Sequence, residues 1–151
     1  MGKYFGTDGF RGEANVNLTA MHAFKVGRFL GHYYGKDHKA SVAIGKDTRR
    51  SSYMFEDALS AGLTSTGADV YLLHVTTTPS VSYVVRTEED FDCGIMISAS
   101  HNPFFDNGIK LINGEGEKME QEVIDKVEEY LDADFDSIPY AQGDAIGRTV
   151  D

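Results

Sequence analysis

The stretch SVAIGKDTRRSSYMFEDALSAGLTSTGADVYLLH (residues 41–74) predicts a strand, a helix and a second strand in immediate succession. Residues 41–46 and 69–74 each contain a short apolar run of strand length, VAI and VYLL. Between them, apolar residues recur at helical spacing, at Phe55, Leu59 and Leu63. Because strand–helix–strand units close as right-handed crossovers, we expect the two strands to lie parallel in one sheet.

The same alternation extends to both sides of this unit. The other expected elements are helices over residues 20–34, from Thr78-Pro79 onward and over 123–131, and strands over 91–97 and 108–112. Asn17 or Thr19 is the expected N-cap of the first helix, Ser51 or Ser52 that of the second, and Thr78 that of the third. The strand over 108–112 follows its predecessor without a helix between them, so we expect it to run antiparallel.

These elements predict an α/β protein, a three-layer α/β/α domain with a mixed, mostly parallel four-stranded sheet. The first 17 residues are rich in Gly, Asn and Asp, and we expect a loop with a short hairpin there. The domain is expected over residues 1–135. Residues 136–151 lose the periodic pattern and are expected to be a linker, with a loose tail on a complete small domain as the alternative.

The composition restricts the kinds of partner. The 151 residues carry a formal net charge of -10, which disfavours nucleic acid and anionic membrane surfaces as partners. No apolar run approaches the roughly 20 residues that span a bilayer, and a signal peptide is not apparent, so we expect a cytoplasmic protein. The only cysteine is Cys93, which excludes an internal disulfide. The acidic face of the last helix is expected to be solvated.

Polar loops follow the carboxyl ends of the predicted parallel strands, where ligands bind in open α/β sheets. These loops are KDTRR (residues 46–50), TTT (76–78) and SASHNPFFDN (98–107), and GTDGFRG (6–12) can join them. Their hydroxyls, amides and cations suit a phosphorylated substrate. A nucleotide-binding P-loop is excluded at GKDT (45–48), because Ala40 stands where that motif requires glycine.

Ser100 is the candidate nucleophile in these loops. A positioned serine can accept and carry a phosphoryl group, and His101 and Lys110 can hydrogen-bond phosphate or move a proton. Asn102 can orient an oxygen, and Arg11 can present a bidentate fork to phosphate. From residue chemistry alone, an ordinary loop serine and a surface arginine remain open alternatives. Asp47 and Arg49 are expected to pair with each other or with neighbouring loops, with direct contact to the substrate as the alternative.

Four motifs together resemble the α-D-phosphohexomutase family. GIMISASHNPFFDNGIK (residues 94–110) resembles the family's phosphoserine signature, and FGTDGFRG (5–12) resembles its N-terminal motif. GKDTR (45–49) and Thr78-Pro79 match two further elements in the family's order. Within the family, the chain is most similar to bacterial members that act on hexosamine phosphates. Ser52 departs from a glycine that is common at its position, a change that touches turn geometry more than chemistry.

The resemblance implies an enzyme, an intramolecular phosphotransferase that interconverts hexosamine 6-phosphate and 1-phosphate through a 1,6-bisphosphate. It implies that Ser100 carries the phosphate and that Mg²⁺ binds this phosphate. It also implies acid/base or phosphate-binding roles for His101 and Lys110, and an ordering role for Arg11. The residues that it implies as contacts of the substrate or its phosphate are Thr7, Asn102, Asp47 and Arg49.

The family has four domains, so the resemblance implies that this chain is the first domain alone. The metal loop, the sugar-reading loop and a second phosphate-binding loop would lie in C-terminal domains outside the chain. The expected partners are therefore a hexosamine phosphate and those missing domains, and the isolated fragment is expected to be inactive. Two alternatives stay open, a family member specific for glucose or mannose phosphates and a non-catalytic module that binds sugar phosphates.

Overall fold

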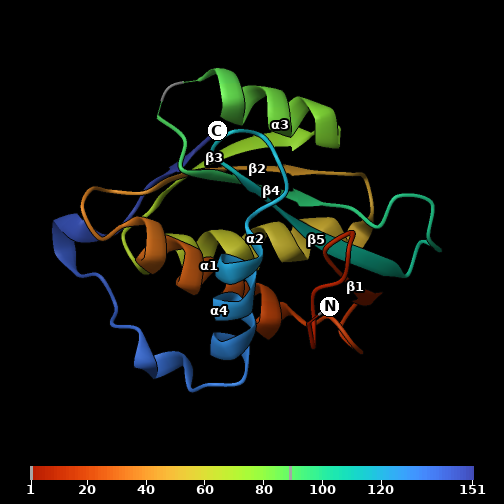
Figure 1. The fold of residues 1–151 in the computed structure, drawn as a ribbon, viewed down its shortest axis with the longest axis horizontal. Helices are drawn as coiled ribbons and strands as arrows, with labels where there is room; N and C mark the ends of the chain where they lie inside the picture. The colour runs from red at the N-terminus through yellow and green to blue at the C-terminus, as the bar shows by residue number, and fades with distance from the viewer. Residues whose placement is uncertain (1, 89) are drawn as a thin grey trace.

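The computed structural model describes residues 2–88 and 90–151 and shows three layers, α/β/α (Figure 1). The helices are α1 (Ala20–Tyr34), α2 (Arg50–Thr64), α3 (Thr78–Thr87) and α4 (Gln121–Leu131), with 3-10 turns at Phe135–Ser137 and Gly143–Ala145. The strands are β1 (Phe10–Glu13), β2 (Ser41–Lys46), β3 (Asp69–Val75), β4 (Cys93–Ile97), β5 (Asp106–Asn113) and β6 (Thr149–Val150). The predicted fold class is confirmed.

One mixed sheet joins these strands in the order β1-β5-β4-β2-β3-β6. The pairs β4–β2, β2–β3 and β3–β6 are parallel, whereas β5 runs antiparallel to both of its neighbours, as predicted. The predicted number of four strands was too low, because the sheet has six. The two additional strands, β1 and β6, lie at the edges and are too short to produce an alternating pattern in the sequence.

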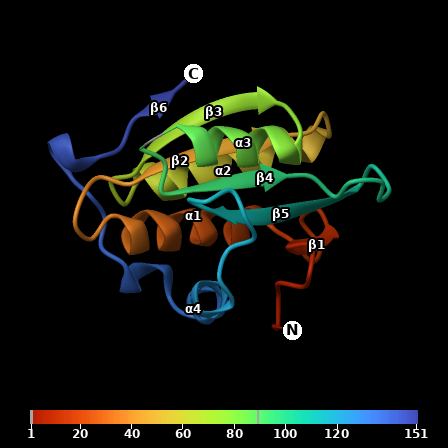
Figure 2. The same cartoon turned by 45° about the horizontal axis from the view of Figure 1, so that its top comes forward.

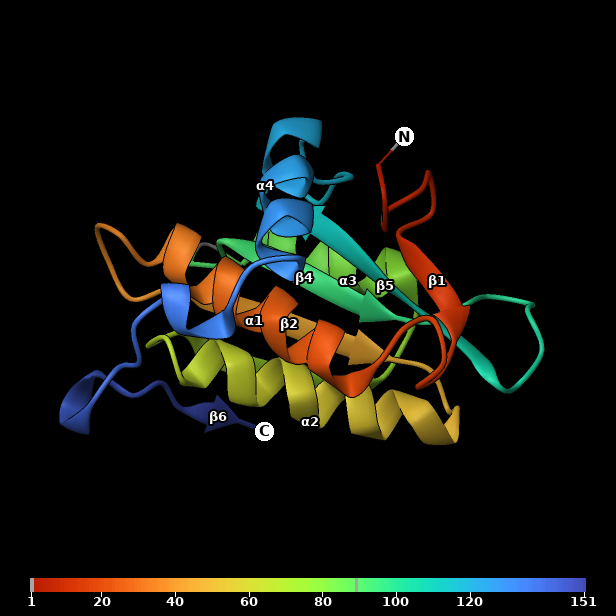
Figure 3. The same ribbon diagram turned by 90° about the horizontal axis from the view of Figure 1, so that it is seen from below.

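The two faces of the sheet bury different helices, because successive strand residues point to opposite sides. Val42 and Ile44 of β2 belong to the larger core with Phe55 of α2, and residues of α1 and α4 complete that core. Ala43 lies in a smaller core with Val81 of α3. Figure 1 shows α3 above the sheet and α1 and α4 below it, Figure 2 shows α3 in front of the strands, and Figure 3 shows the face that carries α1 and α4 from below. None of the described helices is long and apolar enough to cross a membrane.

The helix starts show which of the predicted caps form. Thr19 is the N-cap of α1, and its hydroxyl accepts a hydrogen bond from the backbone N of His22 at 3.2 Å. The prediction for α2 was wrong, because this helix begins at Arg50, before both candidate serines. Ser52 lies in the first turn, and its hydroxyl donates to Oδ1 of Asp47 at 2.6 Å.

The start of α3 differs from the prediction by one residue. Its N-cap is Thr77, whose hydroxyl accepts from the backbone N of Ser80 at 3.2 Å. Thr78 is the first helical residue, so the proline that follows still lies in the first turn, where its missing N–H costs nothing.

Residues 136–151 fold back onto the domain, although the sequence indicated no regular element there. The end of this segment forms β6, which pairs with β3. Its start is held by Arg28 of α1, which is fully buried and donates to Oγ of Ser65 at 2.8 Å and to the backbone oxygens of Phe135 and Ile138. The segment therefore packs against the sheet and α1, while the predicted domain boundary at residue 135 stays a prediction.

Candidate active site

Ser100 lies exposed in the loop that leaves the carboxyl end of β4, and Figure 3 shows this loop extending past the end of the sheet. Its φ of 58° places a non-glycine residue in the left-handed region, which costs on the order of 1 kcal/mol. Its amide donates to Oγ of Ser98 at 3.0 Å, and its hydroxyl lies 3.3 Å from Nδ1 of His101. The loop thus presents a hydroxyl to solvent with an imidazole beside it.

Arg49 contacts this loop from the N-terminal end of α2. Its Nη2 donates to the backbone oxygens of Ser100 at 2.9 Å and Asn102 at 2.7 Å. Its Nη1 pairs with the carboxylate of Asp47, and the side chain of Arg49 is only 11% exposed. The structure therefore brings both predicted residues to the serine loop and directs Arg49 at the backbone of the loop. Their predicted contact with substrate stays a prediction.

Several hydrogen-bond donors surround the carboxylate of Asp47. The backbone N of Arg49 and the hydroxyl of Ser52 donate to its Oδ1 at 3.0 and 2.6 Å. Burial opposes ionisation, but the hydrogen bonds from Ser52, Arg49 and Ser98, with the charge of Arg49, outweigh it and hold the pKa of Asp47 below its ordinary value. Asp47 is therefore a fixed negative charge at neutral pH.

Ser52 and Asn107, both outside the predicted site, extend this network. Asn107 is fully buried at the start of β5, and its Nδ2 donates to Oγ of Ser51 at 2.8 Å and of Ser52 at 3.0 Å. Its Oδ1 accepts from the backbone N of Gly108 at 2.8 Å. The network therefore joins both ends of the serine loop to α2. The signal in the sequence was the serine at position 52, where the resembling family often has glycine.

Arg11 lies on β1 opposite Gly108 of β5. A Cβ on Gly108 would lie 3.0 Å from Cγ of Arg11 and 2.8 Å from the backbone O of Ser98. Glycine therefore lets the arginine side chain lie close to the start of the serine loop. Nε of Arg11 is buried and has no hydrogen-bond partner among the residues that the structure describes.

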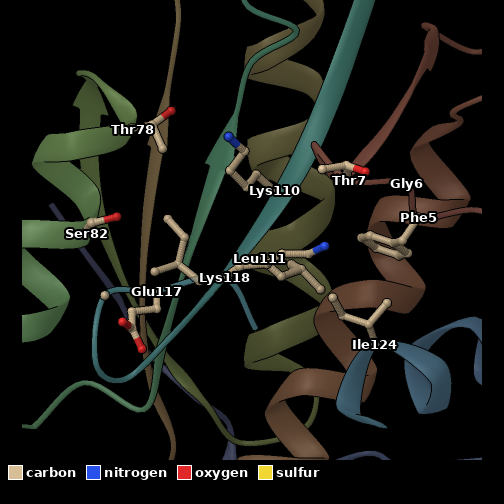
Figure 4. A pocket seen from close by; sticks show the side chains of 13 residues that line it. Phe5, Gly6, Thr7, Thr78, Ser82, Lys110, Leu111, Glu117, Lys118 and Ile124 are labelled. Atoms are coloured by element: carbon tan, nitrogen blue, oxygen red, sulfur yellow. The ribbon is translucent and has the colours of Figure 1, made fainter. Parts of the chain in front are cut away.

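Lys110 and Thr7 line a pocket of about 230 Å³ beside β5. Figure 4 shows Lys110 between Thr7 and Thr78, with Lys118 also lining the pocket. Lys110 follows Gly108 by two residues, so it lies on the same face of the sheet as Arg11. This pocket therefore combines two ammonium groups and threonine hydroxyls with one carboxylate, that of Glu117, so cations outnumber anions in its lining.

The predicted site residues thus form two groups in space. Contacts join the members of the first group around the serine loop, which are Ser100, His101, Asn102, Asp47 and Arg49. The second group, Thr7 and Lys110, lines the pocket, and Arg11 lies beside the start of the loop. Within residues 2–88 and 90–151, no hydrogen bond joins Lys110 or Thr7 to Ser100.

The N-terminal motif is held by α4. Oε2 of Glu128 accepts from the backbone N of both Tyr4 and Phe5 at 2.7 Å, and the hydroxyl of Tyr4 donates to Asp132 at 2.6 Å. The prediction that the acidic face of this helix is solvated was therefore wrong at Glu128. The carboxylate faces the segment that leads to Thr7, and it satisfies two amides that have no strand partner.

The described residues do not by themselves fit a Mg²⁺ site. They contain no group of three or more His, Cys, Asp or Glu side chains placed to hold a metal ion. Asp47, the carboxylate linked to the serine loop through Arg49, already accepts from Ser52 and Arg49. The predicted role of a phosphate on Ser100 as a metal ligand stays a prediction.

The fold and this loop define a class of protein. Residues 2–137 match the family model described as phosphoglucomutase/phosphomannomutase, alpha/beta/alpha domain I. The chain belongs to this family, and the resemblance inferred from its motifs is confirmed.

Individual relatives narrow the comparison. The chain is 75% identical over 151 residues to the phosphoglucosamine mutase of Lachnoclostridium phytofermentans, covering 100% of this chain and 34% of that protein. It is 74% identical over 154 residues to the phosphoglucosamine mutase of Lachnospira eligens, with the same coverage. The chain therefore spans about a third of the length of these curated relatives, 34% in each.

Solved structures agree on the fold. A putative phosphomannomutase from Thermus thermophilus matches with a TM-score of 0.76 at 30% identity, over 97% of this chain and 32% of that chain. A phosphoglucomutase/phosphomannomutase family protein from Burkholderia thailandensis gives the same TM-score of 0.76 at 23% identity, over 97% and 32% of the two chains, and supports the fold alone.

Proposed function

We propose that this chain supplies the phosphoserine part of a phosphoglucosamine mutase, which interconverts glucosamine 6-phosphate and glucosamine 1-phosphate. The observation that carries the proposal is the exposed hydroxyl of Ser100, 3.3 Å from Nδ1 of His101 in a loop whose backbone Arg49 holds. The name of the relative that is 75% identical supports the choice of substrate. Because the chain spans a third of such relatives, we expect the isolated chain to turn over little or no substrate.

The proposed chemistry is two phosphoryl transfers in opposite directions. In the first, the bond between phosphorus and Oγ of Ser100 breaks, and a bond forms to the free hydroxyl of the hexosamine phosphate, giving glucosamine 1,6-bisphosphate. The proton of that hydroxyl passes through a base to Oγ. In the second, Oγ of Ser100 takes the other phosphate from the bisphosphate and the proton returns.

The cationic and polar residues have matching roles in this proposal. His101 and Lys110 exchange the proton or contact phosphate, and Arg11 neutralises oxygen charge near the start of the loop. Thr7 and Asn102 contribute hydrogen bonds to the substrate. Mg²⁺ would bind an oxygen of the Ser100 phosphate and take its remaining ligands from outside the described residues. The predicted cytoplasmic location belongs to the same proposal.

The test uses a chimera in which residues 1–151 replace the matching third of the Lachnoclostridium phytofermentans phosphoglucosamine mutase. We expect intact-mass analysis and peptide mapping to find one phosphate on Ser100, and Ser100→Ala to abolish mutase activity. Ser137→Ala, at an exposed serine far along the chain, is the matched control and should stay active. Full activity of the Ser100 variant, or phosphate only at another residue, would refute the proposal.

A further inference from the structure

We propose that Asp47, Arg49 and Ser52 form a clamp that fixes the backbone of the serine loop. In this clamp Arg49 is a positioning residue and not a ligand of the substrate phosphate. The inference rests on the proposed function of Ser100, and it changes the role that the family resemblance implied for Asp47 and Arg49. It also gives Ser52 a role.

Both Nη atoms of Arg49 are engaged, whereas its buried Nε has no hydrogen-bond partner among the described residues. Nη2 donates to the oxygens of Ser100 and Asn102 at 2.9 and 2.7 Å, and Nη1 pairs with Asp47. The two oxygens belong to the residues on either side of His101, so one guanidinium holds the Ser100–His101 and Asn102–Pro103 peptide units. A phosphate ligand would have to compete with a carboxylate and two carbonyl oxygens for the same donors.

The anchor of the clamp is itself fixed. Ser52 donates to Asp47 at 2.6 Å and accepts from Nδ2 of Asn107 at 3.0 Å. The backbone N of Asp47 donates to the oxygen of Ile97, the last residue of β4, at 3.0 Å. The carboxylate is therefore positioned from α2, from β5 and from the strand that leads into the serine loop.

The loop needs such a clamp because its conformation is costly. Ser100 has a φ of 58°, and a left-handed serine relaxes unless its surroundings hold it. Its side chain is exposed, so packing does not hold it; Oγ of Ser98 holds its amide, and Arg49 holds its carbonyl. Misplacing a reacting group by about 1 Å costs roughly 100-fold in rate. A clamp that fixes the loop would therefore affect the rate of phosphoryl transfer.

The neighbouring cations show that this arrangement is specific to Arg49. Lys46 is engaged elsewhere, because its Nζ lies 2.9 Å from Oε2 of Glu56 on α2 and both side chains are buried. Arg50 is exposed at the start of α2. Arg50 therefore offers a matched control for charge and position.

The first test is hydrogen exchange on the 151-residue chain without substrate. We expect Arg49→Lys and Ser52→Ala to speed exchange of the Ser100 and Asn102 amides about tenfold, because each removes hydrogen bonds of the clamp. Arg50→Lys, at an exposed position outside the network, should leave these amides unchanged. Unchanged exchange in Arg49→Lys would overturn the clamp, even if Ser52→Ala did not fold.

The second test is kinetic and uses the chimera. A clamp predicts that Arg49→Lys lowers kcat roughly 100-fold with KM within about threefold, because substrate binding does not use this side chain. A phosphate ligand at this position predicts the opposite, a raised KM and no change in exchange of the substrate-free loop. Failure of the proposed function is seen separately, as activity that survives Ser100→Ala.

Discussion

The serine loop and the C-terminal segment are both irregular stretches whose backbone oxygens are held by one arginine, yet the two arginines lie in different surroundings. Arg49 pairs with Asp47 beside an exposed loop. Arg28 is fully buried and lies 4.0 Å from the ring of Tyr140, measured from Cζ to the centroid. Among the described residues, Arg28 has no carboxylate partner.

The different surroundings of the two arginines predict different roles, one in folding and one in the geometry of the site. A buried guanidinium without a carboxylate depends on carbonyl, hydroxyl and aromatic partners. When the guanidinium is removed, these partners lose their hydrogen-bond donor. Arg49 is only 11% exposed, but it is paired with a carboxylate and contacts an exposed loop, so water can reach part of what it leaves when it is replaced. Arg28 is therefore expected to control folding of the domain, and Arg49 the geometry of one loop.

The largest expected effect follows from replacing Arg28. We expect Arg28→Met to lower the free energy of unfolding by about 3 kcal/mol, because the buried oxygen of Ile138 and the partly buried oxygen of Phe135 lose a charged donor. Urea denaturation of the chain measures this loss. Arg50→Met, at an exposed position, is the control and should change stability by less than about 0.5 kcal/mol. A loss from Arg28→Met as small as that of the control would remove the distinction between the two regions.

The second effect is a smaller change in stability at the other arginine. We expect Arg49→Lys to cost only about 1 kcal/mol of stability, since the carbonyl of Ser100 is exposed to water and that of Asn102 is only partly buried. The roughly 100-fold fall in kcat that we expect for Arg49→Lys should be much larger than a stability loss of about 1 kcal/mol would produce. If denaturation showed Arg49→Lys to be as damaging as Arg28→Met, the serine loop would be part of the stability core, contrary to the comparison.

The sequence predicted the fold where burial leaves a pattern. The central strands, from Val42 to Ile97, are apolar because helices cover both of their faces, and the boundaries of β2 were predicted to the residue. The edge strands β1 and β6 are two to four residues long, and their pairing is set by the strand beside them, so no periodicity marks them.

In the site, too, the sequence predicted contacts between side chains better than contacts to the backbone. The motifs identified Ser100 and its neighbours in the chain. The sequence predicted that Asp47 and Arg49 pair with each other or with neighbouring loops, and the pair forms. It did not predict which groups of the serine loop Arg49 binds, because these are backbone oxygens, which every residue carries and which no motif distinguishes. Arg28 was missed for the same reason, since its partners Phe135 and Ile138 contribute only their carbonyl groups.

The smallest predicted effect concerns Asp69. Its carboxylate binds an arginine of the C-terminal segment, as the carboxylate of Asp47 binds the arginine that holds the serine loop. Asp69 accepts from the backbone N of Arg148 at 2.8 Å and from Nη2 of the same residue at 3.2 Å. Burial opposes its ionisation, but the hydrogen bonds from Arg148 outweigh it and lower the pKa of Asp69 below the ordinary 3.8. The stabilisation is therefore complete above that value and is lost as pH falls through the lower pKa of the folded state.

We expect Asp69→Asn to remove this acid sensitivity and to cost less than about 1 kcal/mol at pH 7, because the side chain of Arg148 is 70% exposed and its charge is screened by water. Urea midpoints of the chain and the variant should differ at pH 7 and converge as the pH falls below 3.8 and through the lower pKa of the folded state. Asp144→Asn, in an exposed turn of the same segment, is the control. A difference that persists unchanged at low pH would mean that the charge of Asp69 does not hold β6. The segment would then depend on Arg28 and its backbone pairing alone, and the likeness to Asp47 would fail.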